Sequence, residues 1–211
     1  MTLYIIRHGE TDMNRQGIVQ GSGVDSDLND NGRKQARLFY QYYKNLHFEY
    51  IITSNLKRTH QTVEPFLLRG SQQEWVKLPE LNEICWGIHE GRKSDELTHE
   101  SYKKLMGDWE SGVYDTKLEG GESAAELQSR LSKALNFLKH ERYAQKNILV
   151  CTHGRSLLCL LTLLKNEPLS KMNTFKHQNT CLYKVHLVDN EFLFELENDV
   201  QHLGQYKTVN F

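Results

Sequence analysis

The stretch Leu3-Tyr4-Ile5-Ile6-Arg7-His8-Gly9 decides the fold, because an apolar run ends there in a cation, an imidazole and a glycine. A short apolar run rich in β-branched and aromatic residues is typical of a buried strand. The polar residues that follow would lie at the edge of a sheet, and open α/β sheets bind their ligands at the carboxyl ends of the strands. The opening residues therefore predict a central strand and a site at its end.

A second apolar run, at residues 147–152, ends in the same way, in His153-Gly154. The two histidines are far apart in the sequence. If the two strands are parallel neighbours, however, both imidazoles lie at the same rim of the sheet. This repetition is stronger evidence for a site than either histidine alone.

Apolar runs alternate with helical patterns along the chain, which predicts a three-layer α/β/α sandwich with a mostly parallel central sheet. We expect strands at 3–6, 50–53, 74–78 and 147–152, and helices at 31–44, after Ser54, at 94–105 in one or two pieces, at 123–138 and at 157–164. Alternation at 181–187, a turn at Asp189-Asn190 and the run 192–194 predict an antiparallel edge that closes a C-terminal hairpin.

Local signals predict where some helices begin. Ser123 with Glu126 has the spacing of a capping box, and Ser54 is a candidate N-cap of the helix that follows it. We expect that second helix to be interrupted or bent at Pro65.

The chain has 211 residues and a formal net charge of −1, so we expect one domain, 1–211, with an inserted lid of loops and short helices around 84–121. The charge excludes a broad basic face for nucleic acid or membrane lipid. The longest apolar stretch, 157–164, is far shorter than the roughly 20 residues of a membrane span. The chain opens directly on a strand-like run, so we expect no leader peptide, a cytoplasmic protein and four reduced cysteines.

Two arginines point to an anion. Arg58 falls in the first turn of the helix after Ser54, where a cation opposes the helix dipole unless an anion is bound. Arg7 ends a buried strand, where its guanidinium needs a partner to offset desolvation. Two arginines, two histidines and free backbone N–H groups describe a socket for a phosphoryl group. The alternative is that each arginine pairs with a carboxylate such as Glu10 or Glu83.

Several motifs in order along the chain resemble the histidine phosphatase superfamily, in the branch that contains cofactor-dependent phosphoglycerate mutases and small broad-specificity phosphatases. They are Leu-Tyr-Ile-Ile-Arg-His-Gly-Glu-Thr-x-x-Asn at 3–14, Gln20-Gly21, Ser-Asn-Leu-Lys-Arg-Thr-x-Gln-Thr at 54–62, Leu81-Asn82-Glu83, Glu90-Gly91, Gly120-Gly121-Glu122-Ser123 and Thr152-His153-Gly154, with Asn179-Thr180 continuing them. Each motif is weak by itself, but seven in sequence are a strong signal.

The resemblance implies a role for each matched residue. His8 would be the nucleophile that becomes phosphorylated, and Glu83 the general acid and base. The phosphoryl oxygens would be held by Arg7, Arg58 and His153. Asn14, Gln20, Gly21 and the Gly154 N–H would line the phosphate or leaving-group side.

The chemistry is also reasonable without the family. A neutral imidazole is a competent nucleophile near neutral pH, and covalent capture divides one difficult displacement into two easier ones. Phosphoryl transfer needs mainly positioning and charge stabilisation, which fixed cations supply without a metal. We expect Glu83 to protonate the leaving oxygen and later to take a proton from water. No cofactor is expected, and the other histidines lack metal-ligand spacing.

One departure bears on the reaction. Phosphoglycerate mutases carry Arg-His-Tyr-Gly after the glutamate, a segment that helps to clamp the substrate carboxylate, whereas this chain has Ile84-Cys85-Trp86-Gly87. The difference favours a phosphatase acting on a small phosphorylated metabolite. A mutase is the second hypothesis, and a non-catalytic phosphate-binding or interaction module is the third.

The substrate and the oligomeric state are less defined. Trp86 and His89 flank Gly87 near Glu83, so they are candidates for the pocket mouth. The cations Lys93, Lys103, Lys104 and Lys117 could admit a second anionic group, although ordinary surface charge is the preferred interpretation. Leu67, Leu68 and the aromatic C-terminal strand could form a modest interface in a homodimer.

Overall fold

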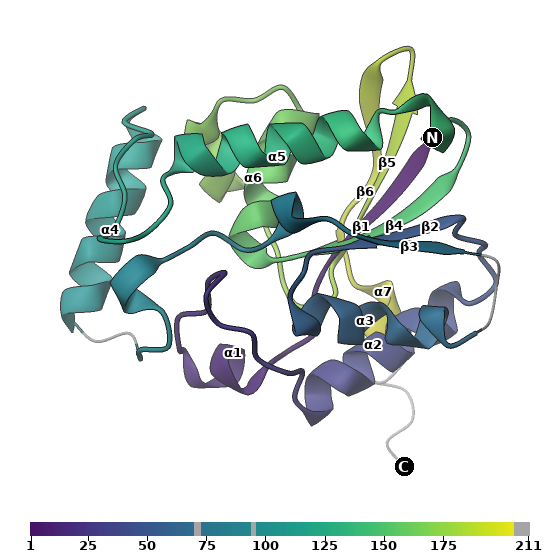
Figure 1. Cartoon of the computed structure of the whole chain (residues 1–211), viewed down its shortest axis with the longest axis horizontal. Helices are drawn as coiled ribbons and strands as arrows, with labels where there is room; N and C mark the ends of the chain where they lie inside the picture. Colours follow the sequence, from purple (N-terminus) through teal and green to yellow (C-terminus); the bar gives the residue numbers. More distant parts are fainter. Residues whose placement is uncertain (70–72, 94–95, 205–211) are drawn as a thin grey trace.

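Six strands form one sheet in a computed structural model that describes residues 1–69, 73–93 and 96–204, without the side chains of 96–98. The strand order is β3-β2-β4-β1-β5-β6. The bounds are β1 Thr2–Arg7, β2 Tyr50–Thr53, β3 Glu74–Lys77, β4 Asn147–Thr152, β5 Leu182–Val188 and β6 Glu191–Asp199. Strands β1 to β4 pair in parallel, whereas β5 and β6 are antiparallel (Figure 1). The predicted fold class is therefore confirmed.

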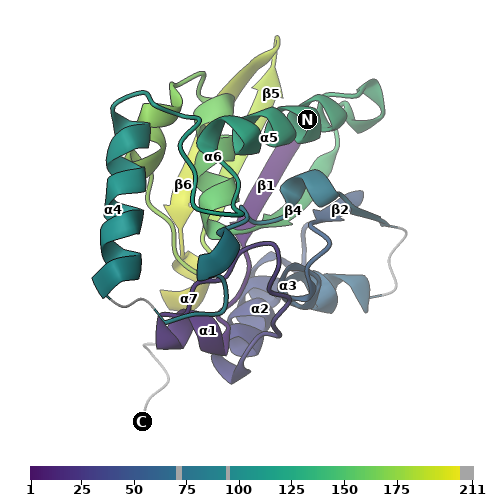
Figure 2. The ribbon, with the colours of Figure 1, turned by 60° about the vertical axis from the view of Figure 1, so that its left-hand side comes forward.

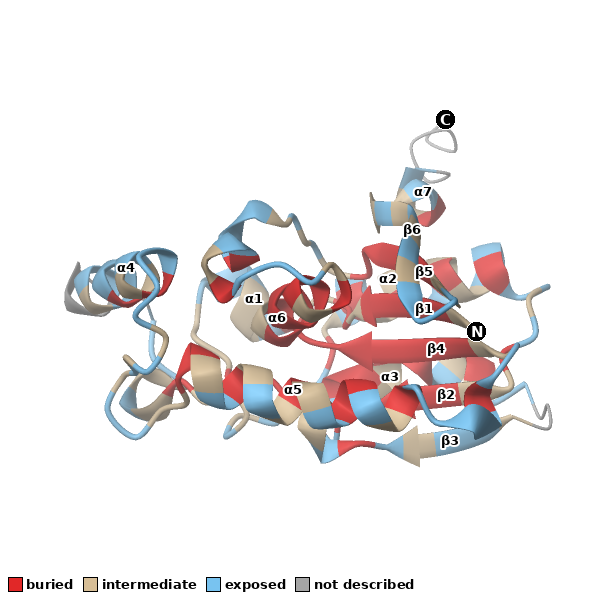
Figure 3. Cartoon of the chain, turned by 90° about the horizontal axis from the view of Figure 1, so that it is seen from above, coloured by how far each residue is buried: buried red, intermediate tan, exposed pale blue. Residues whose placement is uncertain are grey.

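The register of the central strands brings their ends together. Arg7 at the end of β1 is opposite Thr152 at the end of β4, and Thr53 of β2 is opposite Cys151 of β4. The residue after each strand therefore lies at the same rim of the sheet. In Figure 3 the arrows of β1, β3 and β4 point to the side of the molecule on which α4 lies.

Helices cover both faces of the sheet, because each face carries its own set of apolar side chains (Figure 2). One face packs against α5 (Ala124–Leu138) and α6 (Gly154–Leu164), and the other against α2 (Asp30–Tyr43) and α3 (Lys57–Leu67). α4 (Glu96–Glu110) packs against the 3₁₀ segment Leu169–Thr174, away from the sheet. Two short helices complete the described chain, α1 (Asp12–Gln16) and α7 (Gln201–Gly204).

The most apolar helix is also the most buried. From Leu157 to Thr162 every residue of α6 is buried, because the helix is enclosed by the sheet, α5 and the 3₁₀ segment. This explains an apolar pattern that runs around the whole helix. The predicted capping box is confirmed at the start of α5, where Ser123 accepts from the Glu126 N–H and Glu126 accepts from the Ser123 N–H.

The C-terminal hairpin has the predicted turn. Asp189 and Asn190 have positive φ angles of 49° and 65°, a conformation that suits a two-residue hairpin and that asparagine and aspartate tolerate. β5 pairs with β1 on one side and with β6 on the other. In the part of the chain that the structure describes, no helix is long and apolar enough to cross a membrane.

One local prediction was wrong, and two differ from the structure only in part. Ser54 does not cap α3: the cap is Leu56, which has no side-chain bond, because the Ser54 hydroxyl is used by the Leu56 N–H and by a histidine at the rim. Pro65 does not interrupt α3, which continues to Leu67. The helical segment near residue 94 continues to Glu110 as one helix, α4.

Candidate active site

His8 follows β1 directly and is almost fully buried, at 3% exposure. Its Nδ1 lies 2.7 Å from the carbonyl oxygen of Gly9. Since a carbonyl only accepts, Nδ1 carries the proton and Nε2 keeps its lone pair. The Gly9 N–H in turn donates to the Thr62 hydroxyl on α3. The loop after β1 therefore presents His8 as a base and nucleophile through Nε2.

His153 follows β4, and its ring centre lies 5.2 Å from that of His8. Its Nδ1 accepts from Arg58 Nε at 3.0 Å, and its Nε2 donates to the Ser54 hydroxyl at 2.8 Å. Ser54 follows β2 directly. The ends of three neighbouring strands thus supply His8, His153 and Ser54, as the parallel register requires.

Arg58 is fully buried in the first turn of α3. Besides the bond to His153, its guanidinium donates to the carbonyl oxygens of Val24 and Gly21, at 2.7 and 3.2 Å. The loop after α1 therefore positions Arg58 from the other side. Gly21 therefore contacts the Arg58 guanidinium through its backbone carbonyl oxygen.

Arg7 donates through Nη1 to His177 Nδ1 at 3.2 Å, and its buried Nε has no hydrogen-bond partner among the described residues. A methyl group added at Gly154 would lie 3.6 Å from Arg7 Nε, 3.6 Å from Glu83 Oε2 and 3.1 Å from His177 Cε1. These three side chains therefore surround the small space over Gly154. An unpaired guanidinium N–H beside that space is a donor available to a bound anion.

Glu83 lies at the N-terminus of α6. Its Oε1 accepts from the Ser156 N–H and hydroxyl and from the Ile84 N–H, at 3.0 to 3.1 Å. Its Oε2 accepts from the Arg155 N–H at 3.1 Å. The carboxyl group is thus held firmly, and Oε2 is the oxygen that lies near Gly154 and Arg7.

The predicted pocket residues of the first loop form a connected network. Asn14 belongs to the capping box of α1 with Thr11, and its Oδ1 accepts from Asn179 Nδ2 at 3.3 Å. The same Asn179 amide donates to the His8 carbonyl oxygen at 3.0 Å. Gln20 donates to the Thr11 hydroxyl. Asn14 and Gln20 therefore brace the loop beside His8.

Burial determines the charge state of the two imidazoles. Desolvation lowers the pKa of His8 well below its usual 6.5, and the nearby Arg58 and Arg7 lower it further. The pKa of His153 is lowered in the same way, first by burial and then by Arg58. Both rings are neutral at neutral pH. Burial also lowers the pKa of Arg58 to about 10, so Arg58 remains a cation.

The alternative that the arginines are structural ion pairs does not hold. In the described ranges the hydrogen bonds of Arg7 and Arg58 go to imidazole nitrogens and backbone carbonyls. The Glu10 carboxylate accepts from Asn29 instead, and that of Glu83 accepts from the start of α6. Positive charge at the rim is therefore left without a carboxylate in direct contact, which favours binding of an anion.

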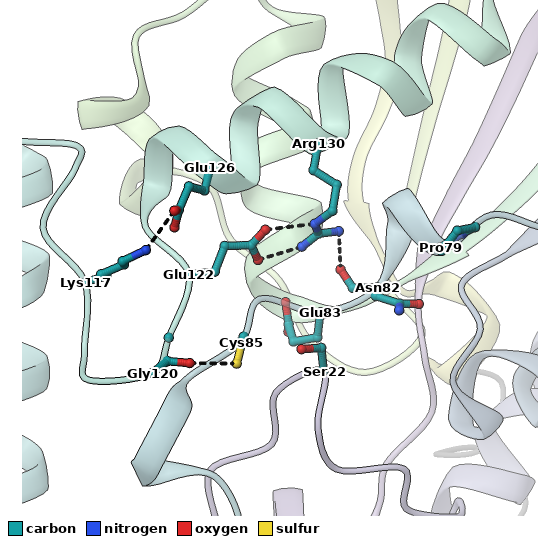
Figure 4. Close-up of a pocket in the computed structure, with 11 residues that line it drawn as sticks. Ser22, Pro79, Asn82, Glu83, Cys85, Lys117, Gly120, Glu122, Glu126 and Arg130 are labelled. Atoms are coloured by element: carbon teal, nitrogen blue, oxygen red, sulfur yellow. Dashed lines mark hydrogen bonds and ion pairs between the residues drawn. The ribbon is translucent and has the colours of Figure 1, made fainter.

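A separate hollow of about 490 Å³ lies on the other side of Glu83 (Figure 4). Its charged groups are already paired, since Arg130 binds both oxygens of Glu122 and Lys117 binds Glu126. Neither His8 nor an arginine of the rim lines it. It is a poor anion socket, and Lys117, a candidate for a second anionic group, is committed to Glu126.

Four site residues had no assigned role in the sequence reading or only a weak signal. The sequence marks Ser54 only as a candidate helix cap, and His177 only as one of the histidines without metal-ligand spacing. Asn179 matched a motif without a stated role. Arg155 belongs to no motif, and its position next to Gly154 is the signal that points to it. No group of histidine, cysteine, aspartate or glutamate residues in the described chain is arranged to hold a metal ion.

The chain is similar to known proteins in sequence and in fold. Residues 3–200 match the sequence profile of the histidine phosphatase superfamily (branch 1). A protein of Serratia proteamaculans named "Probable phosphoglycerate mutase GpmB" is 32% identical over 210 residues, which are 96% of this chain and 95% of that protein.

Two solved structures are also similar. The alpha-ribazole phosphatase of Shigella flexneri has a TM-score of 0.82 at 26% identity, covering 94% of this chain and 96% of that one. A phosphoserine phosphatase of Entamoeba histolytica, in complex with 3-phosphoglyceric acid, has a TM-score of 0.80 at 26% identity, covering 96% and 98%.

Proposed function

Since the chain belongs to branch 1 of the histidine phosphatase superfamily, we propose that it hydrolyses small phosphomonoesters through a phosphohistidine on His8. One observation carries the proposal. The bond from Nδ1 to the Gly9 carbonyl leaves the lone pair of Nε2 free, in a ring kept neutral by burial and by two arginines. An imidazole in this state can attack phosphorus directly.

The first half of the reaction transfers the phosphoryl group. Nε2 of His8 forms a bond to phosphorus while the bond from phosphorus to the ester oxygen breaks, and Arg7 and Arg58 bind the phosphoryl oxygens. The leaving oxygen takes a proton from the Glu83 carboxyl and departs as the alcohol. In the second half, Glu83 takes a proton from water, the water oxygen attacks phosphorus, and inorganic phosphate leaves from Nε2.

His153 has a positioning role in this scheme. Both of its ring nitrogens are occupied, Nδ1 by Arg58 and Nε2 by Ser54. We propose that His153 mainly orients the Arg58 guanidinium. Direct contact with a phosphoryl oxygen, which the family resemblance implies, requires the Nε2–H to leave the Ser54 hydroxyl and to donate to the phosphoryl oxygen instead.

The segment after Glu83 supports hydrolysis over mutase chemistry. Ile84 is fully buried in the core, and the Cys85 thiol donates to the Gly120 carbonyl. Neither offers a charged group to a substrate carboxylate. The solved neighbours named for alpha-ribazole and for phosphoserine are phosphatases, which supports the same conclusion.

Phosphoglycerate mutase activity is the second candidate, and the names of the relatives favour it. A mutase must keep its phosphorylated intermediate from water. We propose that residues 84–121, which include α4, act as the lid over the site.

The third hypothesis, a non-catalytic binding module, has no use for a carboxyl group held beside the arginines.

The test is hydrolysis of 4-nitrophenyl phosphate in the presence of EDTA. We expect phosphate release that His8→Ala abolishes, and a phosphoryl adduct on His8, trapped by rapid alkaline quench, because the phosphorus–nitrogen bond is labile in acid, and found by mass spectrometry. Glu83→Gln should slow release of alkyl alcohols more than of 4-nitrophenolate, because the better leaving group needs less protonation.

The other hypotheses give different results. Interconversion of 2- and 3-phosphoglycerate without release of phosphate would overturn the phosphatase in favour of the mutase. Phosphate binding without turnover of either kind would favour the binding module.

A further inference from the structure

A small cavity lined by rings includes Gln20, which braces the loop beside His8. Its volume is about 220 Å³, and it is lined by Val19, Gln20, Trp86, His89, His99, Tyr102 and Leu118. Four of these seven side chains are aromatic or imidazole rings. An apolar cavity of about 150 Å³ can hold a benzene molecule. The cavity therefore has room for one planar ring.

The cavity is connected to the site from two directions. On one wall, Gln20 precedes Gly21, whose carbonyl oxygen accepts from Arg58. On the other, Arg155 donates its backbone N–H to Glu83 Oε2 and its guanidinium to the hydroxyl of Tyr102, a residue of the cavity wall. A group in the cavity is thus on the side of the proposed acid, where the alcohol of a phosphomonoester must lie.

The aromatic walls are held in place from behind. Trp86 and Trp109 are stacked with ring centres 6.3 Å apart, and Trp86 meets Tyr102 edge to face at 5.6 Å. The Arg155 guanidinium lies 5.9 Å from the centre of Trp86 and donates to the Tyr102 hydroxyl. A site whose walls are fixed before binding loses less entropy when the ligand enters.

One polar atom of the wall is unsatisfied. Nδ1 of His89 is buried and has no hydrogen-bond partner among the described residues. A buried polar atom without a partner costs free energy until something binds it. A ring nitrogen or hydroxyl on the bound group would supply that partner if the His89 ring turns Nδ1 toward the cavity.

We propose that this cavity is the leaving-group subsite and that it selects phosphomonoesters whose alcohol carries a planar aromatic or heteroaromatic ring. The proposal rests on the proposed function, because it assigns the alcohol side of the same site. Stacked and edge-to-face contacts add about 0.5–1.5 kcal/mol beyond the burial of area. A flat ring should therefore bind several-fold better than a puckered one of the same size.

The experiment compares two non-hydrolysable inhibitors, benzylphosphonate and cyclohexylmethylphosphonate, which differ only in whether the six-membered ring is aromatic. We expect benzylphosphonate to inhibit about fivefold more strongly in the full chain. In Tyr102→Leu the ratio of the two inhibition constants should fall toward one. Equal inhibition constants in the unchanged protein would overturn the proposal.

Tyr42 provides a matched control. Tyr102 and Tyr42 are exposed to nearly the same extent, 37% and 38%, but Tyr42 lies on α2 against the other face of the sheet. Tyr42→Leu should keep the aromatic preference. If both variants lose it equally, the effect is not specific to the cavity and the proposal is wrong.

A binding measurement separates this inference from the proposed function. Calorimetry of the two phosphonates reports ring selectivity whether or not the protein turns over a phosphomonoester. Turnover with equal phosphonate affinities would leave the phosphatase standing and refute the ring subsite. Selective binding of benzylphosphonate without turnover would support the ring subsite and refute the proposed phosphatase activity.

Discussion

The reactivity of His8 depends on which ring nitrogen carries the proton. The Gly9 carbonyl binds Nδ1–H, so the lone pair is on Nε2, and the surrounding arginines oppose a second proton. The sequence predicted the residue and its place at a strand end. The tautomer follows from a turn of the backbone that no pattern of residue types reveals.

Histidine-selective ¹³C NMR can check the charge state of His8. Burial, Arg58 and Arg7 lower its pKa, so the neutral form should persist as the pH falls from about 8 through the usual value of about 6.5. Loss of one signal in His8→Asn assigns the resonance. A His8 signal that titrates at or above the usual value would contradict the proposed nucleophile.

Gly154→Ala tests the small space over the site. The added methyl would lie 3.1 Å from His177 and 3.6 Å from both Arg7 Nε and Glu83 Oε2, so it would occupy room that a phosphoryl group needs. We expect kcat/KM for 4-nitrophenyl phosphate to fall at least about tenfold, with the free energy of unfolding changed by no more than about 1 kcal/mol. Both quantities are measured on the same samples.

Gly107→Ala is the control for that change. Gly107 lies in α4, and an added methyl there meets nothing within 4 Å. It should leave kcat/KM intact and raise stability slightly, because alanine is the better helix former. An equal loss of activity in both variants would show that Gly154 does not border the site.

At the scale of elements, the predictions that succeeded are those in which the interacting residues are close together in the sequence. The capping box of α5 and the turn of the hairpin involve residues within three positions of each other. Ser54 shows the opposite case. Its hydroxyl could cap a helix, but a histidine 99 residues away competes for it. A capping prediction fails when a distant partner takes the cap side chain.

Ser123→Ala should weaken the start of α5. The hydroxyl accepts the Glu126 N–H, and loss of such a cap costs about 1 kcal/mol. Urea denaturation followed by circular dichroism measures the change. Ser132→Ala in the same helix is the control, since Ser132 only donates to the Gln128 carbonyl one turn earlier; a cost as large as that of Ser123→Ala would contradict the capping role.

At the scale of the whole molecule, buried histidines couple folding to pH. Burial lowers the pKa of both His177 and His202 to about 4, whereas the unfolded chain takes up protons near 6.5. Between those values the unfolded state binds more protons. Stability therefore falls as the pH drops from about 6.5 toward about 4, by up to about 1.4 kcal/mol per pH unit for each histidine.

His202→Phe should reduce this pH dependence. The ring is 1% exposed and packs edge to face on Phe39 at 5.1 Å, so a phenyl ring fits the same place without titrating. Urea denaturation at several values between about pH 4.5 and about pH 7 gives the slope, which should decrease by up to one proton. An unchanged slope would show that His202 does not resist protonation in the fold.

The sequence by itself determined the elements and the identity of the reactive groups. Apolar runs define strands and helix faces through local periodicity. A cation or a histidine at the end of such a run can also be read directly from the sequence. His8, His153, Arg7 and Arg58 could therefore be named from the pattern, and Glu83 from the family resemblance. The structure places all five around one rim.

Tertiary structure alone decided how these groups are held and what lies beside them. The contact of His177 with Arg7, the bond of Ser54 to His153 and the ring-lined cavity at Trp86 and Tyr102 all join segments distant in sequence. Such contacts depend on the register of strands and on the packing of loops and helices onto them. No local pattern contains that information, because a side chain acquires these partners only when the chain has folded.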